Sequence, residues 1–224
     1  MIQHIIRLIG TYTQSLFAKI ASKKTYLLPS ITGRGLVVGL LLLSAVAGNA
    51  QITIGGNVYG GGNAGVVEGN TTVTVRGGDL NAVFGGARMA DVGGAATVNI
   101  DGAHISNDII INYIYGGNDI TGTIAGNASV HTIPERKVTT GEGNDAVTTQ
   151  PYSIFIGQLY GGGNGDYNYS EETIGEEANP YYGMALPLLA QTYLDIKGGT
   201  IGHLYGGGNS VTVTEQTTKI GRAH

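Results

Sequence analysis

The sequence predicts an all-β protein, a parallel β-helix or related β-solenoid of irregular coils, behind an N-terminal signal segment. Glycine supplies 39 of the 224 residues, well above its usual share of about 7%. A motif of an aliphatic residue, an aromatic residue and Gly-Gly recurs along the chain. Segments that precede several copies alternate apolar and polar residues, which is the pattern of a half-buried strand.

Composition excludes several other classes of protein. The chain has only 5 prolines and its glycines have no three-residue period, so it is not collagen-like. Charged residues make up 12%, too few for a coiled coil, and hydrophobic residues make up 42%, too many for wholesale disorder. Because there is no cysteine, the chain has no disulfide framework, no thiol nucleophile and no Cys-based zinc site.

Residues 1–50 are predicted to be a signal peptide with a long basic N-terminal part. Residues 35–47 carry no charge; this apolar run is shorter than the roughly 20 residues of a membrane span but suits the core of a secretory signal. Arg34 and the lysines upstream supply the positive flank, and small residues precede a cleavage site between Ala50 and Gln51. The alternative is an N-terminal membrane anchor. Either interpretation exports the chain from the cytoplasm.

Charge differs sharply between the signal segment and the body. The first 50 residues hold 5 basic residues and no acid, so the remaining chain holds the other 7 basic residues and all 16 acids, a net charge of −9. An acidic body argues against nucleic acid as a partner.

The body from residue 51 to residue 219 is predicted to be a glycine-rich repeat region. The aromatic residue of the motif falls at positions 59, 84, 115, 160 and 205, so the spacings are 25, 31, 45 and 45 residues. The alternating segments upstream also match one another, and they are residues 72–80, 97–105 and 193–201.

Such a unit of two short strands and two glycine turns cannot bury its apolar face alone, whereas stacked copies can. The 25-residue spacing corresponds to one coil, and the longer spacings contain insertions that leave the stack as loops. The inserted stretches are 129–151 and 171–191, and residues 166–191 are the predicted functional loop. The alternative architecture is an antiparallel β-sandwich, because short strands separated by turns also form one.

Residues 220–224 are a possible sequencing artefact. Their codons can match the end of a common sequencing adapter, so the protein's own sequence is expected to end near Lys219 in this chain. The last strand begins at Val211 and shows no polar cap, which suggests truncation of the repeat array.

The Tyr-Gly-Gly-Gly-Asn motifs behind a secretory signal resemble the glycine-rich β-solenoid passenger regions of large secreted or surface proteins of gram-negative bacteria, which are often adhesin-like. The resemblance covers residues 51 to about 214. It implies a cell-surface or extracellular role. The sequence differs from that family in its irregular coil lengths, and it shows no C-terminal barrel or sorting domain. Membrane contact is therefore expected only through the signal segment or an anchor missing from this sequence.

The tyrosines of the motif are candidate ligand-binding residues. If they face outward, Tyr59, Tyr115, Tyr160 and Tyr205 form a stripe that binds sugars. The alternative is that they pack on the glycine turns, while the aliphatic residue before each of them fills the core. Two further candidate tyrosines, Tyr181 and Tyr182, lie in the inserted loop.

No cofactor is expected, with calcium as the one alternative. Gly162-Gly163-Asn164-Gly165-Asp166 approaches the calcium-binding β-roll motif. The acids that could supply hard oxygen ligands are Asp119, Asp166, Glu171, Glu172, Glu176 and Glu177. The competing interpretation of these acids is a solvated acidic loop.

The function predicted from the sequence is therefore non-enzymatic. We expect an exported surface protein, adhesin-like or a structural scaffold, that presents loops to a glycan or to a host or cell-surface protein. The alternative is a polysaccharide-cleaving β-helix enzyme, which needs paired carboxylates. Asp101, Asp166 and Asp195 are its candidates, and Asp101 and Asp195 are expected to occupy equivalent positions on outward strand faces.

Overall fold

The computed structural model describes residues 51–221 and shows an all-β protein with parallel sheets, which confirms the predicted fold class at that level. The predicted signal segment 1–50, including Ala50 of its cleavage site, and residues 222–224 lie outside the described residues. Within 51–221, no helix has the length and hydrophobicity that a membrane span requires.

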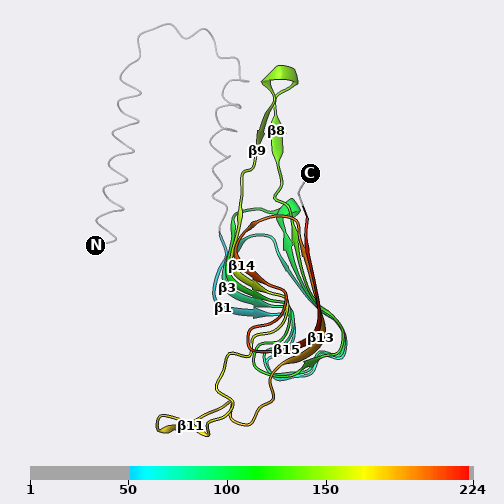
Figure 1. Cartoon of the computed structure of the whole chain (residues 1–224). Coiled ribbons are helices and arrows are strands. Elements are labelled where there is room, and N and C mark those ends of the chain that lie inside the picture. Colours follow the sequence, from blue (N-terminus) through cyan, green and yellow to red (C-terminus); the bar gives the residue numbers. More distant parts are fainter. Residues whose placement is uncertain (1–50, 222–224) are drawn as a thin grey trace, which may run out of the picture. The chain divides into compact units, whose positions relative to one another are not determined.

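Two large sheets make up most of the structure (Figure 1). Sheet A contains, in spatial order, β1 (Thr53–Tyr59), β3 (Gly78–Phe84), β5 (Ile109–Tyr115), β10 (Ile154–Tyr160) and β14 (Thr200–Tyr205). Sheet B contains β15 (Thr212–Ile220), β13 (Leu188–Ile196), β7 (Ala128–Ile133), β4 (Ala96–Asp101) and β2 (Thr71–Val75), and the short β6 (Thr123–Ile124) also pairs with β13.

The chain passes alternately through the two sheets, and neighbouring strands within each sheet are parallel. The antiparallel pairing expected of a β-sandwich is therefore not the pairing of these sheets. In sheet A the register aligns the motifs, since Val83 pairs with both Val58 and Ile114, and Leu159 pairs with Leu204. Parallel pairing in this register places residues of the same kind in columns across the strands.

An aliphatic core lies between sheets A and B. The aliphatic residue of each central motif is fully buried, as the alternation pattern predicted, and these residues are Val83, Ile114 and Leu159. They belong to one cluster with Val98 and Leu194 of sheet B. Side chains on one face of a strand repeat every second residue, so each strand contributes several residues to this core.

The first glycine of each Gly-Gly pair brings the backbones of successive motifs into contact. A Cβ atom on Gly116 would overlap the carbonyl oxygen of Gly161, and the same relation joins Gly60 to Gly85, Gly85 to Gly116, and Gly161 to Gly206. The parallel hydrogen bonding continues through this turn, because Gly85 N–H donates to the Tyr115 carbonyl at 2.9 Å. Glycine is required here by the close approach of two backbones.

After each glycine turn the chain forms a second, smaller apolar cluster before it enters sheet B, which includes Ala87, Val92, Ile124 and Leu189. The buried Asn118 fixes this part of the chain. Its Oδ1 accepts from the Ala87 N–H at 2.8 Å, and its Nδ2 donates to the Ala90 carbonyl at 3.0 Å. The asparagine of the motif therefore satisfies backbone groups that the turn leaves unpaired.

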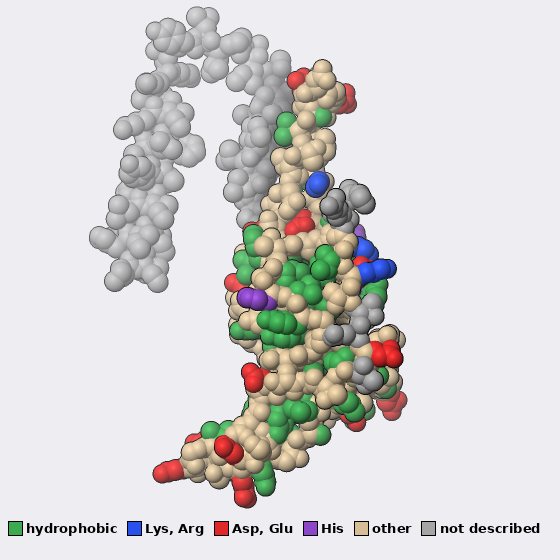
Figure 2. Space-filling model, in the orientation of Figure 1, with side chains coloured by type: hydrophobic (Ala, Val, Ile, Leu, Met, Phe, Trp, Pro, Cys, Tyr) green, Lys and Arg blue, Asp and Glu red, His purple; other side chains and the backbone are tan. Residues whose placement is uncertain are grey.

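Two short antiparallel hairpins leave the sheets within the predicted insertions 129–151 and 171–191. The bounds of these insertions were too wide, because residues 129–133 belong to β7 and residues 188–191 to β13 of sheet B. One consists of β8 (Val138–Thr140) and β9 (Val147–Thr149), with the 3-10 turn η2 (Gly143–Asp145) between them. The other consists of β11 (Thr173–Ile174) and β12 (Glu177–Ala178). Figure 2 shows acidic side chains near the ends of both projections. A second 3-10 turn, η1 (Gly102–His104), follows β4.

Replacing the central glycine of this column is expected to destabilise the fold. Gly116→Ala places a methyl group on the Gly161 carbonyl, and overpacking of this kind lowers the free energy of unfolding by about 1–3 kcal/mol or more. Gly65→Ala is the control, because a Cβ there meets open space. Urea titration of both variants tests this expectation, and equal stability of the two would contradict it.

Candidate functional site

The five aromatic residues of the motif form one continuous stack. Neighbouring ring centroids lie 4.7 to 5.0 Å apart along the order Tyr59, Phe84, Tyr115, Tyr160, Tyr205, and the rings are within 17° of parallel. This separation matches the spacing of adjacent strands, about 4.8 Å. The four predicted ligand-binding tyrosines of the motif differ in exposure. Tyr115 and Tyr160 are buried, Tyr59 is half-buried and Tyr205 is 43% exposed.

A second row of side chains lies two positions before the aromatic residue. Parallel pairing aligns Ala82, Tyr113, Gln158 and His203 across sheet A. Tyr113 is 38% exposed. Its ring lies 6.4 Å from that of Tyr115, and the His203 ring lies 6.4 Å from that of Tyr205, nearly parallel in each case. Ala82 is buried and Gln158 half-buried, so Tyr113 and His203 are the exposed rings of this row, and they continue the aromatic stack toward solvent.

The outer face of sheet A is hollowed beside this row. Two successive residues of β5, Asn112 and Tyr113, are exposed, so the burial alternation is interrupted there. On β10 the residue beside Asn112 is Gly157, and on β14 the next one is Gly202, whereas Asn81 stands beside Asn112 on β3. A Cβ on Gly157 would lie 2.6 Å from the Asn112 carbonyl oxygen. The result is a groove of about 590 Å³. We call it the sheet A groove, and it is lined by Asn81, Asn112, Tyr113, Gly157, Gln158, Gly202 and His203.

A more polar hollow continues the groove toward the glycine turns. It has a volume of about 390 Å³ and shares Tyr113 and Gln158 with the sheet A groove. We call it the Asp166 cleft, and it is lined by Tyr113, Tyr115, Gln158, Tyr160, Asn164, Asp166, Tyr167 and Asn209. Together the two hollows offer aromatic faces, amides, an imidazole and one carboxylate.

Behind the Asp166 cleft lies a buried carboxylate, Asp119, which is 1% exposed. Three neutral groups donate hydrogen bonds to it: the Tyr59 hydroxyl at 2.7 Å, the Tyr167 hydroxyl at 2.8 Å and the Asn164 amide at 2.9 Å. A buried ionised group is tolerated only when such donors replace its water. Burial, and then the hydrogen bond to Asp119, raise the pKa of Tyr59 to about 12. The same two causes raise the pKa of Tyr167.

Tyrosines also fasten the inserted loop, residues 165–187, to the rest of the fold. The Tyr169 hydroxyl donates to the Ile120 carbonyl at 2.5 Å. The ring of Tyr167 lies 4.8 Å from that of Tyr181, so this predicted binding residue instead supports the loop. Tyr182, the other predicted loop tyrosine, is exposed. The Asp166 cleft thus receives one of its walls, Asp166 and Tyr167, from the inserted loop, whereas the residues that line the sheet A groove all lie on strands.

Apart from Asp119, the acids proposed as calcium ligands are spread along this loop. Asp166 lines the cleft, whereas the Glu171 carboxylate accepts a hydrogen bond from the Asn168 amide at 2.6 Å, and Glu172 is exposed. Across residues 51–221, no group of three or more His, Asp or Glu side chains is arranged to hold a metal ion.

The expectation that Asp101 and Asp195 occupy equivalent positions is wrong. Asp195 pairs with His131, which pairs with Asn99, so Asp101 lies two residues further along its strand. Asp101 is buried, and its carboxylate lies 2.9 Å from the Arg76 guanidinium and 3.0 Å from a ring nitrogen of His104. Burial opposes ionisation of Asp101, but these contacts outweigh it and lower the pKa of the carboxyl.

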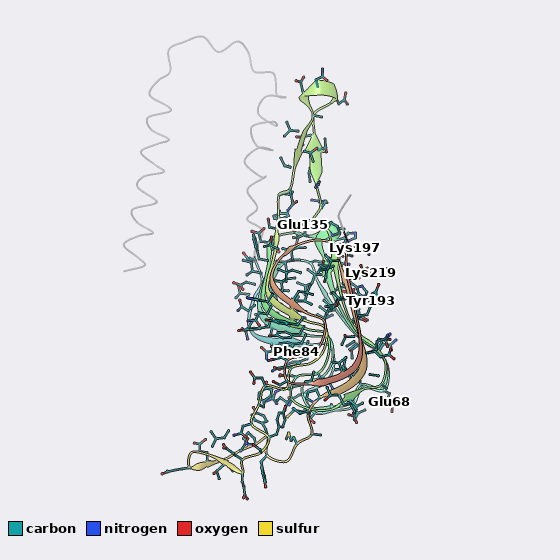
Figure 3. All side chains as sticks on the ribbon, viewed as in Figure 1. Glu68, Phe84, Glu135, Tyr193, Lys197 and Lys219 are labelled. Atoms are coloured by element: carbon teal, nitrogen blue, oxygen red, sulfur yellow. The ribbon has the colours of Figure 1, made fainter. Side chains whose placement is uncertain are left out.

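Asp195 is likewise paired, since its carboxylate lies 2.5 Å from the Lys197 ammonium. Figure 3 shows Lys197, Lys219 and Tyr193 along sheet B, whereas Phe84 of the aromatic stack lies in sheet A. Both carboxylates are therefore engaged in ion pairs on sheet B, away from the strand row that lines the sheet A groove.

The sequence indicates Asp119 only as a possible calcium ligand, and it does not single out five other residues of the site, which are Asn164, Tyr167, Tyr113, Gln158 and His203. For the last three a signal was present, because each stands two residues before the aromatic residue of its motif. Comparison with protein-family models, curated proteins and solved structures gave no match.

The tyrosines around Asp119 predict loss of stability in alkali. Burial, and then the charge of Asp119, raise the pKa of Tyr169 to about 12, the same value to which the pKa of Tyr59 is raised. In the unfolded chain these phenols ionise near pH ~10. Their contribution is therefore complete below that pH and is lost as the pH rises toward 12. Urea unfolding across this range should show the loss, and Tyr59→Phe should reduce its steepness; full ionisation of all tyrosines near pH ~10 without unfolding would contradict it.

Removing one donor to Asp119 is expected to loosen the inserted loop. Tyr167→Phe leaves the buried carboxylate without its 2.8 Å hydroxyl partner, and hydrogen bonds to charged groups contribute about 1.5–3 kcal/mol. Hydrogen exchange of the amides in residues 165–187 should accelerate by at least about tenfold. The exposed Tyr182 provides the control. If Tyr182→Phe accelerates exchange as much as Tyr167→Phe does, the role of the Asp119 bond is refuted.

Proposed function

We propose that this protein is an exported, adhesin-like surface scaffold, built as a β-solenoid, that binds glycans in the sheet A groove. The solenoid interpretation is supported by the alternation of the chain between two parallel sheets, with motif positions aligned strand by strand. In such a stack each layer buries the apolar face of its neighbour, which is why short strands separated by glycine turns suffice to make a core.

The observation that carries the binding function is the exposed row beside the groove. Tyr113 and His203 present ring faces, while Asn112 and Gln158 present amides. A pyranose has an apolar C–H face and a rim of hydroxyl groups, so it packs on a ring and exchanges hydrogen bonds with amides at the same time. Mostly neutral groups that converge on a concave surface are typical of a site for an uncharged polar ligand.

The location of the groove on a sheet favours extended ligands. The row from Tyr113 to His203 crosses three successive strands, so a linear glycan laid across them contacts several layers of the stack. Weak contacts that are linked along one chain reinforce one another through effective concentration. This is the physical basis on which a surface scaffold would hold a polysaccharide or a glycosylated partner.

The inserted hairpin favours a second kind of partner, a host or cell-surface protein. Ile174 of β11 lies between the glutamates that precede and follow it in the chain and is 53% exposed. An exposed apolar side chain among charged ones is typical of a protein contact surface.

The enzymatic alternative has weaker support, because hydrolysis needs two carboxylates flanking the bond. Among the residues that line the groove and cleft, Asp166 is the single carboxylate.

A glycan array probed with the purified protein tests the proposed function. We expect binding to a limited set of glycans, and the double variant Tyr113→Ala and His203→Ala should weaken it by at least about tenfold. The control is Phe155→Ala, because Phe155 is exposed on β10 but does not line the groove. Absence of binding to every glycan, or an equal loss in the control, would refute the proposal.

A further inference from the structure

We propose that the Asp166 cleft selects glycans that carry a protonated amino group, so that the preferred ligand is an amine-bearing sugar such as a hexosamine. The inference rests on the proposed function, because it names the class of glycan that the groove would take. Its basis is the hydrogen-bonding polarity and charge of the cleft.

The hydroxyl protons of two cleft tyrosines are already used inside the protein. The Tyr167 hydroxyl donates to Asp119 at 2.8 Å, and the Tyr160 hydroxyl donates to the Gln158 side-chain oxygen at 2.7 Å. A hydroxyl has one proton and two lone pairs, so both oxygens can meet a ligand only as acceptors. Asp166 adds a carboxylate, which in its ionised form accepts hydrogen bonds and donates none. These acceptors of the cleft are therefore complementary to a ligand group that carries several hydrogen-bond donors.

The charge of the cleft points the same way. None of the eight residues that line it is Lys, Arg or His, and Asp166 is one of them. Asp119 adds a second negative charge directly behind Tyr167 and Asn164. Within residues 51–221 the ion pairs are formed by Asp101 and Asp195, so neither Asp119 nor Asp166 has an ion-pair partner there. Arg88, whose charge acts on Tyr59 beside Asp119, forms no ion pair with either. A low-dielectric wall with unpaired negative charge favours a cationic ligand group.

An ammonium group satisfies both requirements. It has three donors and no acceptor, which matches the lone pairs of Tyr160, Tyr167 and Asp166. The cleft is also walled by four tyrosines. Tyr115 and Tyr160 have both ring faces covered within the aromatic stack, so the ligand meets the ring edges and hydroxyl groups of these two. With a volume of about 390 Å³, the cleft suits a group the size of one sugar residue, while Tyr113, shared with the sheet A groove, is placed to contact the next.

Calorimetric titration with a matched pair of ligands tests the inference. The probes are a glucosamine oligosaccharide and its fully N-acetylated counterpart of equal length, at a pH at which the free amines are protonated. We expect the amine form to bind at least about tenfold more tightly, with a preference that shrinks as salt is added.

The variant Asp166→Asn keeps the shape of the side chain and removes its charge. It should abolish most of the preference while leaving the affinity for the N-acetylated form within about twofold. Glu142→Gln makes the same change in net charge on the β8–β9 hairpin and should alter the affinity for neither oligosaccharide. Because Asp166 is exposed, the melting temperature should also stay the same.

The outcomes separate this inference from the proposed function. Equal binding of both oligosaccharides by the natural protein overturns the amine preference and leaves glycan binding intact. A preference that survives in Asp166→Asn, or that Glu142→Gln also removes, overturns the assignment to this cleft. Failure of both oligosaccharides and of every array glycan to bind overturns the proposed function itself.

Discussion

Direct contact between the backbones of successive motifs is the constraint on which the rest of the structure depends. At the column that begins with Gly60 and runs through Gly116, the carbonyl of one layer occupies the space that a Cβ of the next would need. Glycine therefore allows the sheet spacing to continue through a sharp turn, where side chains would force the layers apart. Since the aromatic residue precedes this glycine in the chain, its ring is brought to the same separation from its neighbours, 4.7 to 5.0 Å.

The aromatic stack in turn shapes the groove. Buried rings such as Phe84 and Tyr115 cover one another and leave their outer neighbours, Tyr113 and His203, at the surface. Bulk is removed one position earlier by Gly157 and Gly202, which hollows the sheet beside that row. A change of side-chain size at one strand position thus makes this face of sheet A concave and polar, while the parallel register of the strands continues.

Much of this arrangement follows from the sequence because it is local or periodic. The motifs, the buried aliphatic residue of each central motif and the presence of two insertions were predictable from spacing and alternation, whereas the bounds of the insertions were not. The expected equivalence of Asp101 and Asp195 was wrong, although the matching segments 97–105 and 193–201 already align Asp195 with Asn99 and Asp101 with Lys197. Residues two apart on a strand face the same side, so alternation alone does not separate the two positions. The Asp119 cluster was also missed. Its donors Tyr59 and Tyr167 lie 60 and 48 residues away, and the second comes from a loop whose fold has no period.

Asp119 links the repetitive and irregular parts of the molecule. It directly follows Asn118, whose amide is hydrogen-bonded to Ala87 and Ala90 after the preceding motif. Asp119 itself accepts hydrogen bonds from both an early strand and the inserted loop. Burying a carboxylate costs free energy unless every lone pair finds a donor, so the loop is most stable where it supplies Tyr167 and Asn164. Those same two residues line the cleft that holds Asp166. Docking of the loop and formation of the cleft are consequently one event, and a ligand that fills the cleft stabilises the docked loop by mass action.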